Sequence, residues 1–259
     1  MTYSDKFEEE FLYALMTKLC SMNVPIVFKG AMVLKAIQYM NNDTSGLERI
    51  THDADGDWVG EMPTMEYLTN ILQQAVNQLN LNFIVIPYRE YSDHRSAGFN
   101  FIDNSTGDKI TSLDLSVRPN NCMEMYSCGE NISFYGQSIN KIIVDKLVVC
   151  SSKLVFRRIK DVIDLYILSF NWVGCNTDLI ELLLYLNKQL GGFVEFNTKY
   201  NDLKHAYSKY HNKAATLDFD IIYKRAKVFM QPFICRVKDR CRWDGSKWVM
   251  IGGHTKICN

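Results

Sequence analysis

The chain has 259 residues, enough for one large domain or two of modest size. Its 47% apolar and 22% charged residues exclude global disorder, because disordered chains are poor in apolar residues. The 29 basic and 29 acidic residues cancel, so nothing indicates a general attraction to nucleic acids or membranes. Any contact with a polyanion must be confined to a local patch.

The first half of the chain alternates between helical and extended patterns. Apolar residues at helical spacing predict an amphipathic helix over 7–19, and Ser4 is a suitable N-cap. A short apolar run at 24–28 predicts a buried strand, which Gly30 separates from a helical pattern at 31–40. The same reasoning predicts strands at 51–59, 83–88 and 132–135, a hairpin of 98–103 with 109–117, and a helix at 68–79.

The pattern becomes helical after residue 137. Helices are predicted at 139–150, 158–170, 177–190 and 217–230. We therefore expect an α+β protein with two domains. A mixed sheet flanked by helices would occupy residues 1–136, and a helical C-terminal half would occupy residues 137–259.

The tail over 231–259 contains the sequence Trp-Asp-Gly-Ser-Lys-Trp at 243–248, which is typical of a hairpin. Residues 221–247 hold eight bases and two acids, a density that could follow a nucleic-acid backbone. The alternative is a surface hairpin whose tryptophans pack on the helical half. We favour that alternative.

The eight cysteines lie far apart, with no Cys-x2-Cys pair and no histidine at finger-like spacing beside them, which disfavours a zinc site. No stretch approaches the roughly 20 uncharged apolar residues of a membrane helix. Acidic residues near the N-terminus are unlike a secretory signal. We expect a cytoplasmic protein with free thiols and no membrane contact.

A strongly acidic segment follows the first predicted strand–turn–helix unit. Residues 43–66 contain seven acids and one base, Arg49. Side chains alternate along a strand, so Asp53 and Asp55 would project from one face about 7 Å apart, where they can share one hard cation or bracket two. Asp57 continues that face. The alternative is a surface strand with solvated carboxylates.

The neighbouring segments favour the metal interpretation. Lys29-Gly30-Ala31 joins a strand to a helix, and small residues there would let a triphosphate approach backbone N–H groups at the positive end of the helix. Asp114 lies on another predicted strand, so three carboxylates could meet across a sheet. One or two Mg²⁺ ions held there would bind triphosphate oxygens and activate a hydroxyl for phosphoryl or nucleotidyl transfer.

The helical half contains a second charged group. Residues 141–160 hold six bases, including Lys146, and one acid. Asp161 and Asp164 are three residues apart and therefore share one helix face. This basic region would suit a nucleoside triphosphate. The alternative is a helix pair carrying ordinary surface ion pairs.

Together these segments resemble the AbiEii/AbiGii-type nucleotidyltransferases, the toxins of type IV toxin–antitoxin systems within the polymerase-β-like nucleotidyltransferase superfamily. The resemblance covers about residues 24–170. It is carried by Lys29-Gly30-Ala31 with Leu34, by Arg49, Thr51, Asp53 and Asp55, and by the run from Lys146 to Tyr166 with Lys160, Asp161 and Asp164.

The resemblance implies a nucleotidyltransferase-like mixed sheet and a set of residue roles. Asp53, Asp55 and Asp114 would be the metal carboxylates, and Asp114 would accept the proton of the acceptor hydroxyl. Lys146 would contact the triphosphate, and Asp161 matches the acid of the family's last motif. The implied nucleotide-binding set is Lys29, Gly30, Ala31, Arg49, Thr51, Lys146 and Asp164.

The sequence also departs from the family pattern. Gly30-Ala31 replaces the usual Gly-Ser, which removes a hydroxyl and affects nucleotide affinity more than fold. His52 should point away from the metal face, as a packed histidine. We expect Lys146→Ala to lower activity more than tenfold without unfolding the chain.

The resemblance implies an enzyme that uses Mg²⁺ to transfer a nucleoside monophosphate from an NTP to a tRNA 3′ end. It would act as a toxin neutralised by a cognate antitoxin protein. A second hypothesis keeps the transfer but changes the acceptor to a small molecule, such as an antibiotic, or to a protein. A third is a catalytically silent relative that binds a nucleotide or a partner.

Overall fold

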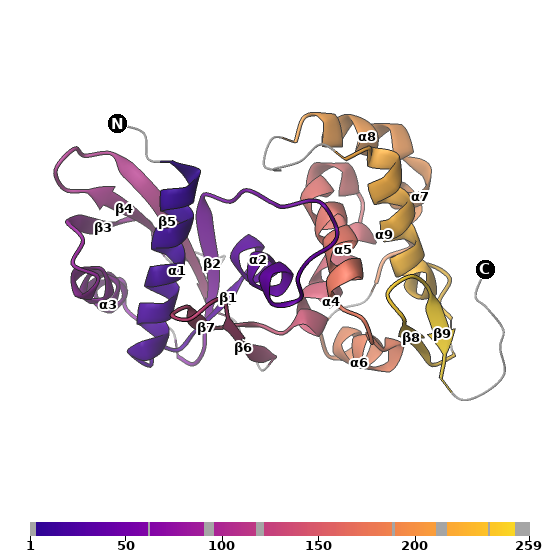
Figure 1. The fold of residues 1–259 in the computed structure, drawn as a ribbon, viewed down its shortest axis with the longest axis horizontal. Coiled ribbons are helices and arrows are strands. Elements are labelled where there is room, and N and C mark those ends of the chain that lie inside the picture. Colours follow the sequence, from indigo (N-terminus) through magenta and orange to yellow (C-terminus); the bar gives the residue numbers. More distant parts are fainter. Residues whose placement is uncertain are drawn as a thin grey trace. The chain divides into compact units, whose positions relative to one another are not determined.

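The computed structural model describes residues 4–61, 63–90, 96–117, 122–187, 190–210, 217–237 and 239–251. It divides into two compact units (Figure 1). Unit 1 comprises Met1–Ala36 and Ile50–Ser138, and unit 2 comprises Ile37–Arg49 and Ile139–Asn259. Residues 37–49, which the expected boundary places in the first half, therefore group with the helical unit.

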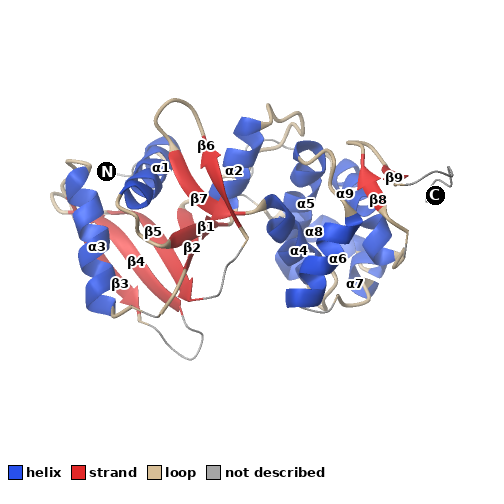
Figure 2. Ribbon diagram, turned by 90° about the horizontal axis from the view of Figure 1, so that it is seen from below, coloured by secondary structure: helices blue, strands red, loops and turns tan. Residues whose placement is uncertain are grey.

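Unit 1 is built on a seven-stranded mixed sheet with strand order β3-β4-β5-β2-β1-β7-β6 (Figure 2). Two pairs, β2 with β5 and β1 with β7, are parallel, and the other neighbouring pairs are antiparallel. The strands are β1 (Ile26–Lys29), β2 (Asp53–Trp58), β3 (Phe83–Arg89), β4 (Ser96–Asp103), β5 (Lys109–Val117), β6 (Met123–Ser127) and β7 (Ser133–Gln137).

Helices α1 (Asp5–Ser21) and α3 (Met65–Gln78) contact each other and pack on this sheet. Helix α1 begins at the predicted cap, where the Ser4 hydroxyl accepts a hydrogen bond from the backbone N–H of Phe7. Its Phe11 ring meets the Phe101 ring edge to face, with 5.3 Å between centroids. Phe101 and the other buried apolar side chains of β4 face these helices. Because side chains alternate along a strand, the residues between them lie on the opposite face of the sheet.

Unit 2 is helical, with α5 (Ile159–Asn171) buried along nearly its whole length. Helix α2 (Ala31–Met40) passes from unit 1 into it after Ala36. The other helices are α4 (Ile139–Cys150), a 3₁₀ turn (Val155–Arg158), α6 (Thr177–Asn187), α7 (Val194–Thr198), α8 (Tyr200–Ser208) and α9 (Phe219–Ile234). Together, the sheet of unit 1 and the helices of unit 2 confirm the predicted α+β class.

A short hairpin, β8 (Cys241–Trp243) with β9 (Trp248–Met250), packs on α9. The Trp243 indole is fully buried and donates to the backbone carbonyl of Ser169 at 2.8 Å. The Trp248 indole donates to the backbone carbonyl of Phe229 at 2.9 Å. The favoured interpretation of the tail as a hairpin with packed tryptophans is confirmed.

The loop that follows α2 is fixed to α5 by polar contacts. The Tyr166 hydroxyl donates to the Ser45 carbonyl at 2.8 Å, and the Asn171 side-chain amide donates to Asp43 at 2.6 Å. These bonds explain why residues 37–49 belong to the helical unit. Within the described ranges, no helix has the length and apolar character needed to cross a membrane.

Candidate functional site

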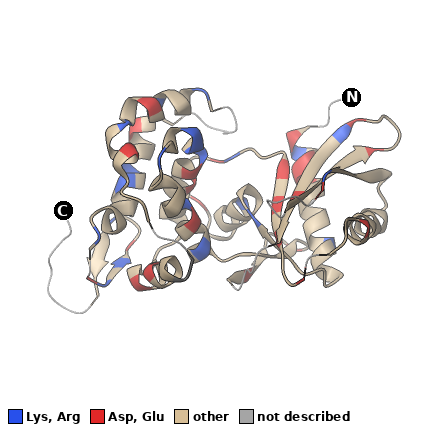
Figure 3. Cartoon of the chain, turned by 180° about the vertical axis from the view of Figure 1, so that it is seen from behind, with Lys and Arg blue, Asp and Glu red and all other residues tan. Residues whose placement is uncertain are grey.

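Two carboxylates project from the face of β2 opposite α1 and α3. The neighbouring Ala54 is buried on the helix-covered face, so alternation places Asp53 and Asp55 together on the other one. Asp55 is in register with Asp114 on the parallel strand β5 and with Lys29 on the antiparallel strand β1. Figure 3 colours the acidic positions of the chain red, those of β2 among them.

The turn between β1 and α2 brings backbone close to one of these carboxylates. Gly30 has φ of +75°, a left-handed conformation that glycine adopts without a Cβ penalty. A Cβ added at Gly30 would lie 3.0 Å from Oδ2 of Asp55. Ala31 follows as the first residue of α2, so Asp55 lies at the helix end where backbone N–H groups are unpaired and favour anions.

Other predicted residues of unit 1 support the acidic strand. The buried Thr51 hydroxyl lies 3.0 Å from both the backbone oxygen and Oδ1 of Asp53, and it orients that side chain. The Lys29 ammonium forms an ion pair with Asp57. His52 bonds to Glu8 of α1 at 2.7 Å, in agreement with the expectation that it points away from the carboxylate face. It is half exposed, however, and so is not a packed histidine.

Asp114 is engaged by two side chains that the sequence did not single out. The Tyr88 hydroxyl donates to Oδ1 of Asp114, and the Arg89 guanidinium lies 2.8 Å from the same oxygen. Burial and the hydrogen bond to Asp114 raise the pKa of Tyr88 to about 12, so the hydroxyl remains a donor near neutral pH. Asp114 is thus a carboxylate already held by a cation and a phenol.

The donor chemistry of the acidic strand fits Mg²⁺. Mg²⁺ prefers oxygen ligands and is usually held by one or two carboxylates together with substrate phosphates. Asp53 and Asp55 supply two carboxylates on one strand face beside a helix N-terminus. Among the described residues, no group of three or more His, Cys, Asp or Glu side chains is arranged to hold a metal. The fit therefore rests on the Asp53–Asp55 pair, because Arg89 occupies Asp114.

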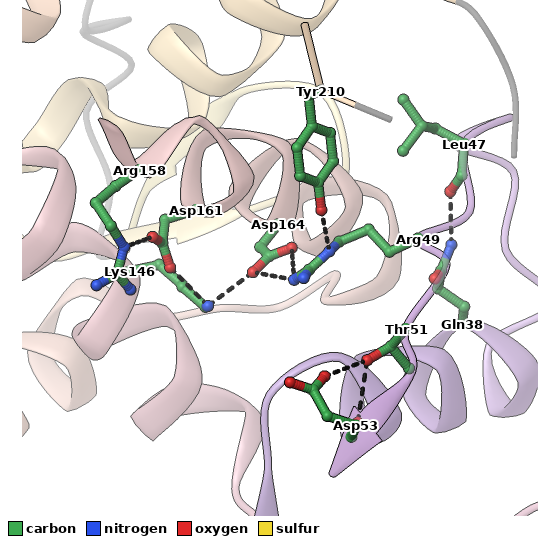
Figure 4. Close-up of polar contacts among 10 residues, drawn as sticks. All are labelled: Gln38, Leu47, Arg49, Thr51, Asp53, Lys146, Arg158, Asp161, Asp164 and Tyr210. Carbon is green, nitrogen blue, oxygen red and sulfur yellow. Dashed lines mark hydrogen bonds and ion pairs between the residues drawn. The ribbon is translucent and has the colours of Figure 1, made fainter. Parts of the chain in front are cut away.

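Unit 2 holds a buried network of charged side chains around Lys146 (Figure 4). The Lys146 ammonium lies 2.7 Å from Oδ1 of Asp161 and 2.7 Å from Oδ2 of Asp164. Arg158 contacts Asp161 at 2.8 Å. Arg49 contacts both oxygens of Asp164, at 2.7 and 2.9 Å. Asp161 and Asp164 are fully buried, so the alternative of ordinary surface ion pairs is wrong.

Burial and charge act in opposite directions in this network. Burial by itself would lower the pKa of Lys146, but the charges of Asp164 and Asp161 outweigh it and raise the pKa above its usual range. Burial would raise the pKa of Asp164, yet Arg49 and Lys146 bring it below its usual value. Lys146 and Asp164 therefore stay ionised at neutral pH. By formal charge, the cations Lys146, Arg49 and Arg158 face two carboxylates, which leaves one net positive charge.

The structure thus gathers the predicted residues into two sets. Unit 1 brings together Lys29, Gly30, Ala31, Thr51, Asp53, Asp55 and Asp114, and unit 2 brings together Arg49, Lys146, Asp161 and Asp164. Sequence analysis missed the partners Tyr88, Arg89, Arg158 and Tyr210. Only Arg158 carried a usable signal, its i,i+3 spacing to Asp161.

No protein-family model and no curated protein matches the sequence. The solved structures similar to the chain include a toxin and an antibiotic-resistance factor. MenT4, a nucleotidyltransferase toxin from Mycobacterium tuberculosis H37Rv, is 14% identical, with 88% of this chain and 84% of that chain covered and a TM-score of 0.48. The antibiotic-resistance factor ANT(2″)-Ia is 15% identical, with 80% of this chain and 100% of that chain covered and a TM-score of 0.42. Both scores lie below 0.5, so neither structure carries a functional argument for this chain.

Proposed function

We propose that this protein is an NTP-dependent nucleotidyltransferase that uses Mg²⁺. One observation carries the proposal: Asp53 and Asp55 share a strand face, and the Asp55 carboxylate lies against the Gly30 turn at the N-terminus of α2. That arrangement offers oxygen ligands for a cation next to N–H groups for phosphates. A bound metal–triphosphate needs both.

In this proposal each residue of unit 1 has a distinct task. Asp53 and Asp55 would hold Mg²⁺, which when bound neutralises the triphosphate and polarises its oxygens. The N–H groups at Gly30 and Ala31 would receive phosphate oxygens. Thr51 keeps Asp53 in place, and Lys29 keeps Asp57 paired and away from the phosphates.

Asp114 would accept the proton of the attacking hydroxyl. It lies in register with Asp55 and is held by Tyr88 and Arg89. Arg89 must then shift for Asp114 to work as a base or as a third metal ligand. The hydrogen bond from Tyr88 would keep the carboxylate aimed during that shift.

The remaining predicted residues, Arg49, Lys146, Asp161 and Asp164, form the buried network of unit 2. Arg158 joins this network and brings its formal charge to one net positive. We propose that this charge favours binding of a triphosphate.

We further propose that the acceptor is the 3′ end of a tRNA and that the protein acts as a toxin restrained by a cognate antitoxin protein. The resemblance of residues 24–170 to the AbiEii/AbiGii type supports this role. A basic groove leading to the metals would favour an RNA acceptor, whereas an acidic second pocket would favour an aminoglycoside.

The test is incubation of the protein with Mg²⁺, each labelled NTP and total tRNA. We expect label to enter tRNA with the wild type and to fall at least a hundredfold with Asp55→Asn. The control Glu61→Gln removes an exposed acid from the same segment and should keep full activity. Label entering an aminoglycoside instead would overturn the tRNA proposal. Absent incorporation together with absent NTP binding would favour a silent relative.

A further inference from the structure

The edge strand β3 exposes an apolar stripe on the same sheet face as the carboxylates. Ile84, Ile86 and Tyr88 alternate along β3 and are 36%, 43% and 48% exposed. Ile86 is in register with Asn100 on β4, and Asn100 is in register with Ser112, two residues before Asp114 on β5. The register of β3 with β4 shifts between Pro87 and Arg89, but the bond from Tyr88 to Asp114 places that ring on the same face. Three large apolar side chains are thus left uncovered next to a polar site.

Tyr88 lies flat across the neighbouring strand because β4 has a glycine beneath it. A Cβ at Gly98 would lie 2.5 Å from Cζ of Tyr88 and 2.8 Å from Oδ1 of Asp114. Only the absence of a side chain there lets the ring reach from β3 to Asp114 on β5. The charge of Asp53 also acts on the Tyr88 hydroxyl, so the ring borders the acidic face.

Two cations flank the same ring. The Arg89 guanidinium lies 5.7 Å and the Lys109 ammonium 6.0 Å from its centroid. Arg89 is paired with Asp114. Lys109 forms no ion pair with any residue that the structure describes, so its charge is available to a ligand anion.

A buried acceptor lies in the adjacent row of this face. Asn100 on β4 is in register with Ile86 on β3 and with Ser112 on β5, and Ser112 is in register with Asp53. The Oδ1 atom of Asn100 is buried and has no hydrogen-bond partner among the described residues. A buried oxygen without a donor costs stability unless a ligand or water satisfies it.

We propose that Ile86, Tyr88, Asn100 and Lys109 form a binding site for the terminal nucleotides of a single-stranded RNA acceptor. A base would stack on Tyr88, and its amino group would donate a hydrogen bond to Oδ1 of Asn100. Lys109 would contact the backbone phosphate. The terminal hydroxyl would then lie beside Asp114. Lys109 places a positive charge beside the Tyr88 ring, which suits a backbone phosphate. This inference rests on the proposed function for the identity of the reaction, but RNA binding can be measured without it.

The test is fluorescence anisotropy of a short labelled single-stranded RNA, without NTP, against purified full-length variants. Tyr88→Leu should raise the Kd roughly tenfold through lost stacking, whereas Tyr88→Phe should leave it within about twofold. Lys109→Gln should weaken binding and reduce the slope of log Kd against log salt by about 0.7, the value for one single-strand phosphate. The control Lys6→Gln removes an exposed charge from α1 of the same unit and should change neither quantity. Thermal melts of every variant establish folding.

The outcomes separate the two proposals. Equal Kd values for wild type, Tyr88→Leu and Lys109→Gln would overturn the RNA site, as would a wild type that binds aminoglycoside but no RNA. If RNA binding follows the expected pattern but no NTP is transferred to any acceptor, the proposed function fails and the RNA site stands. If NTP transfer occurs but the variants bind RNA as tightly as the wild type, the RNA site fails and the proposed function stands.

Discussion

Arg49 donates hydrogen bonds to both carboxylate oxygens of Asp164, at 2.7 and 2.9 Å, although the two residues are 115 positions apart in sequence. Its Nε also donates to the Tyr210 hydroxyl at 3.1 Å. Both Arg49 and Asp164 were predicted to bind nucleotide, and the structure shows them bound to each other. A phosphate that contacts either residue must therefore bind donor groups that the Arg49–Asp164 pair does not use, or must break the pair.

Replacement of Lys146 by methionine should destabilise the protein by about 3–5 kcal/mol, because it leaves two buried carboxylates facing each other without their shared cation. This revises the expectation that truncation at position 146 would leave the fold intact. The matched control is Lys141→Met on the same helix, whose partner Asp145 is 44% exposed, and it should cost about 1 kcal/mol or less. Urea unfolding measures both. Equal losses would show that the network contributes nothing special.

The buried network should also shape the pH dependence of stability. The folded pKa of Asp164 is lowered below its ordinary 3.8, so its contribution is present above that pH and is lost as the pH falls through the folded value. The folded pKa of Lys146 is raised above its ordinary 10.5, so its contribution is present below that pH and is lost as the pH rises through the folded value. At neutral pH the free energy of unfolding of the wild type should exceed that of Asp164→Asn. The difference between the two proteins should narrow as the pH falls below about 3.8. A difference that stays constant down to the acid limit would contradict this assignment.

Substitution of Gly30 by alanine tests the turn under Asp55. Its φ of +75° and the 3.0 Å approach to Asp55 imply backbone strain of about 1–2 kcal/mol and a displaced carboxylate. Gly46→Ala is the control, since its φ of +68° carries similar strain and a Cβ there would meet no atom within 4 Å. Both variants should melt at lower temperature. Only Gly30→Ala should also lose NTP affinity, measured by calorimetric titration.

Arg225→Lys should destabilise unit 2 by about 1–3 kcal/mol, because lysine reproduces neither the stacked plane nor the forked bonds. The Arg225 guanidinium lies 4.2 Å from the Phe170 centroid and 5.0 Å from the Trp243 centroid, and it donates to Ser169 and to the Gly245 carbonyl. Arg242→Lys, at an exposed position of β8, is the control and should change stability little. Urea unfolding distinguishes them. An unchanged midpoint for Arg225→Lys would show that the hairpin packs without it.

The helices and strands with a clear pattern of apolar residues were predictable from the sequence. Residues 31–40 were predicted as a helix and form α2 with the same limits, and residues 109–117 were predicted as a strand and form β5. Local pattern sufficed because most residues of both segments are buried, so their apolar residues were visible in the sequence. The common face of Asp53 and Asp55 followed from strand alternation alone.

The missed elements lack that pattern. Strand β6 buries only Tyr126 and is held at the sheet edge by its backbone pairing to β7. Helix α8 buries only Leu203 and Tyr207. Two apolar residues are too few to reveal a period against a polar background. In both cases the surrounding structure decides the conformation.

The partners of the charged residues could not be predicted, because they come from segments distant in sequence. Nothing near Asp114 indicates that Tyr88 and Arg89 would reach it, since that contact requires β3, β4 and β5 to pair in the observed register. The reach of Tyr88 also depends on Gly98, whose role appears only once the strands are adjacent. Pairing over such sequence separations is set by the whole fold.

The parallel register of β2 with β5 also has a consequence for biosynthesis. Asp55 is made early but meets Asp114 only after the intervening helix and two strands have emerged and paired. A nascent chain that stops before Val117 cannot complete this face. The order of the strands therefore delays assembly of the carboxylate face until most of unit 1 has been translated.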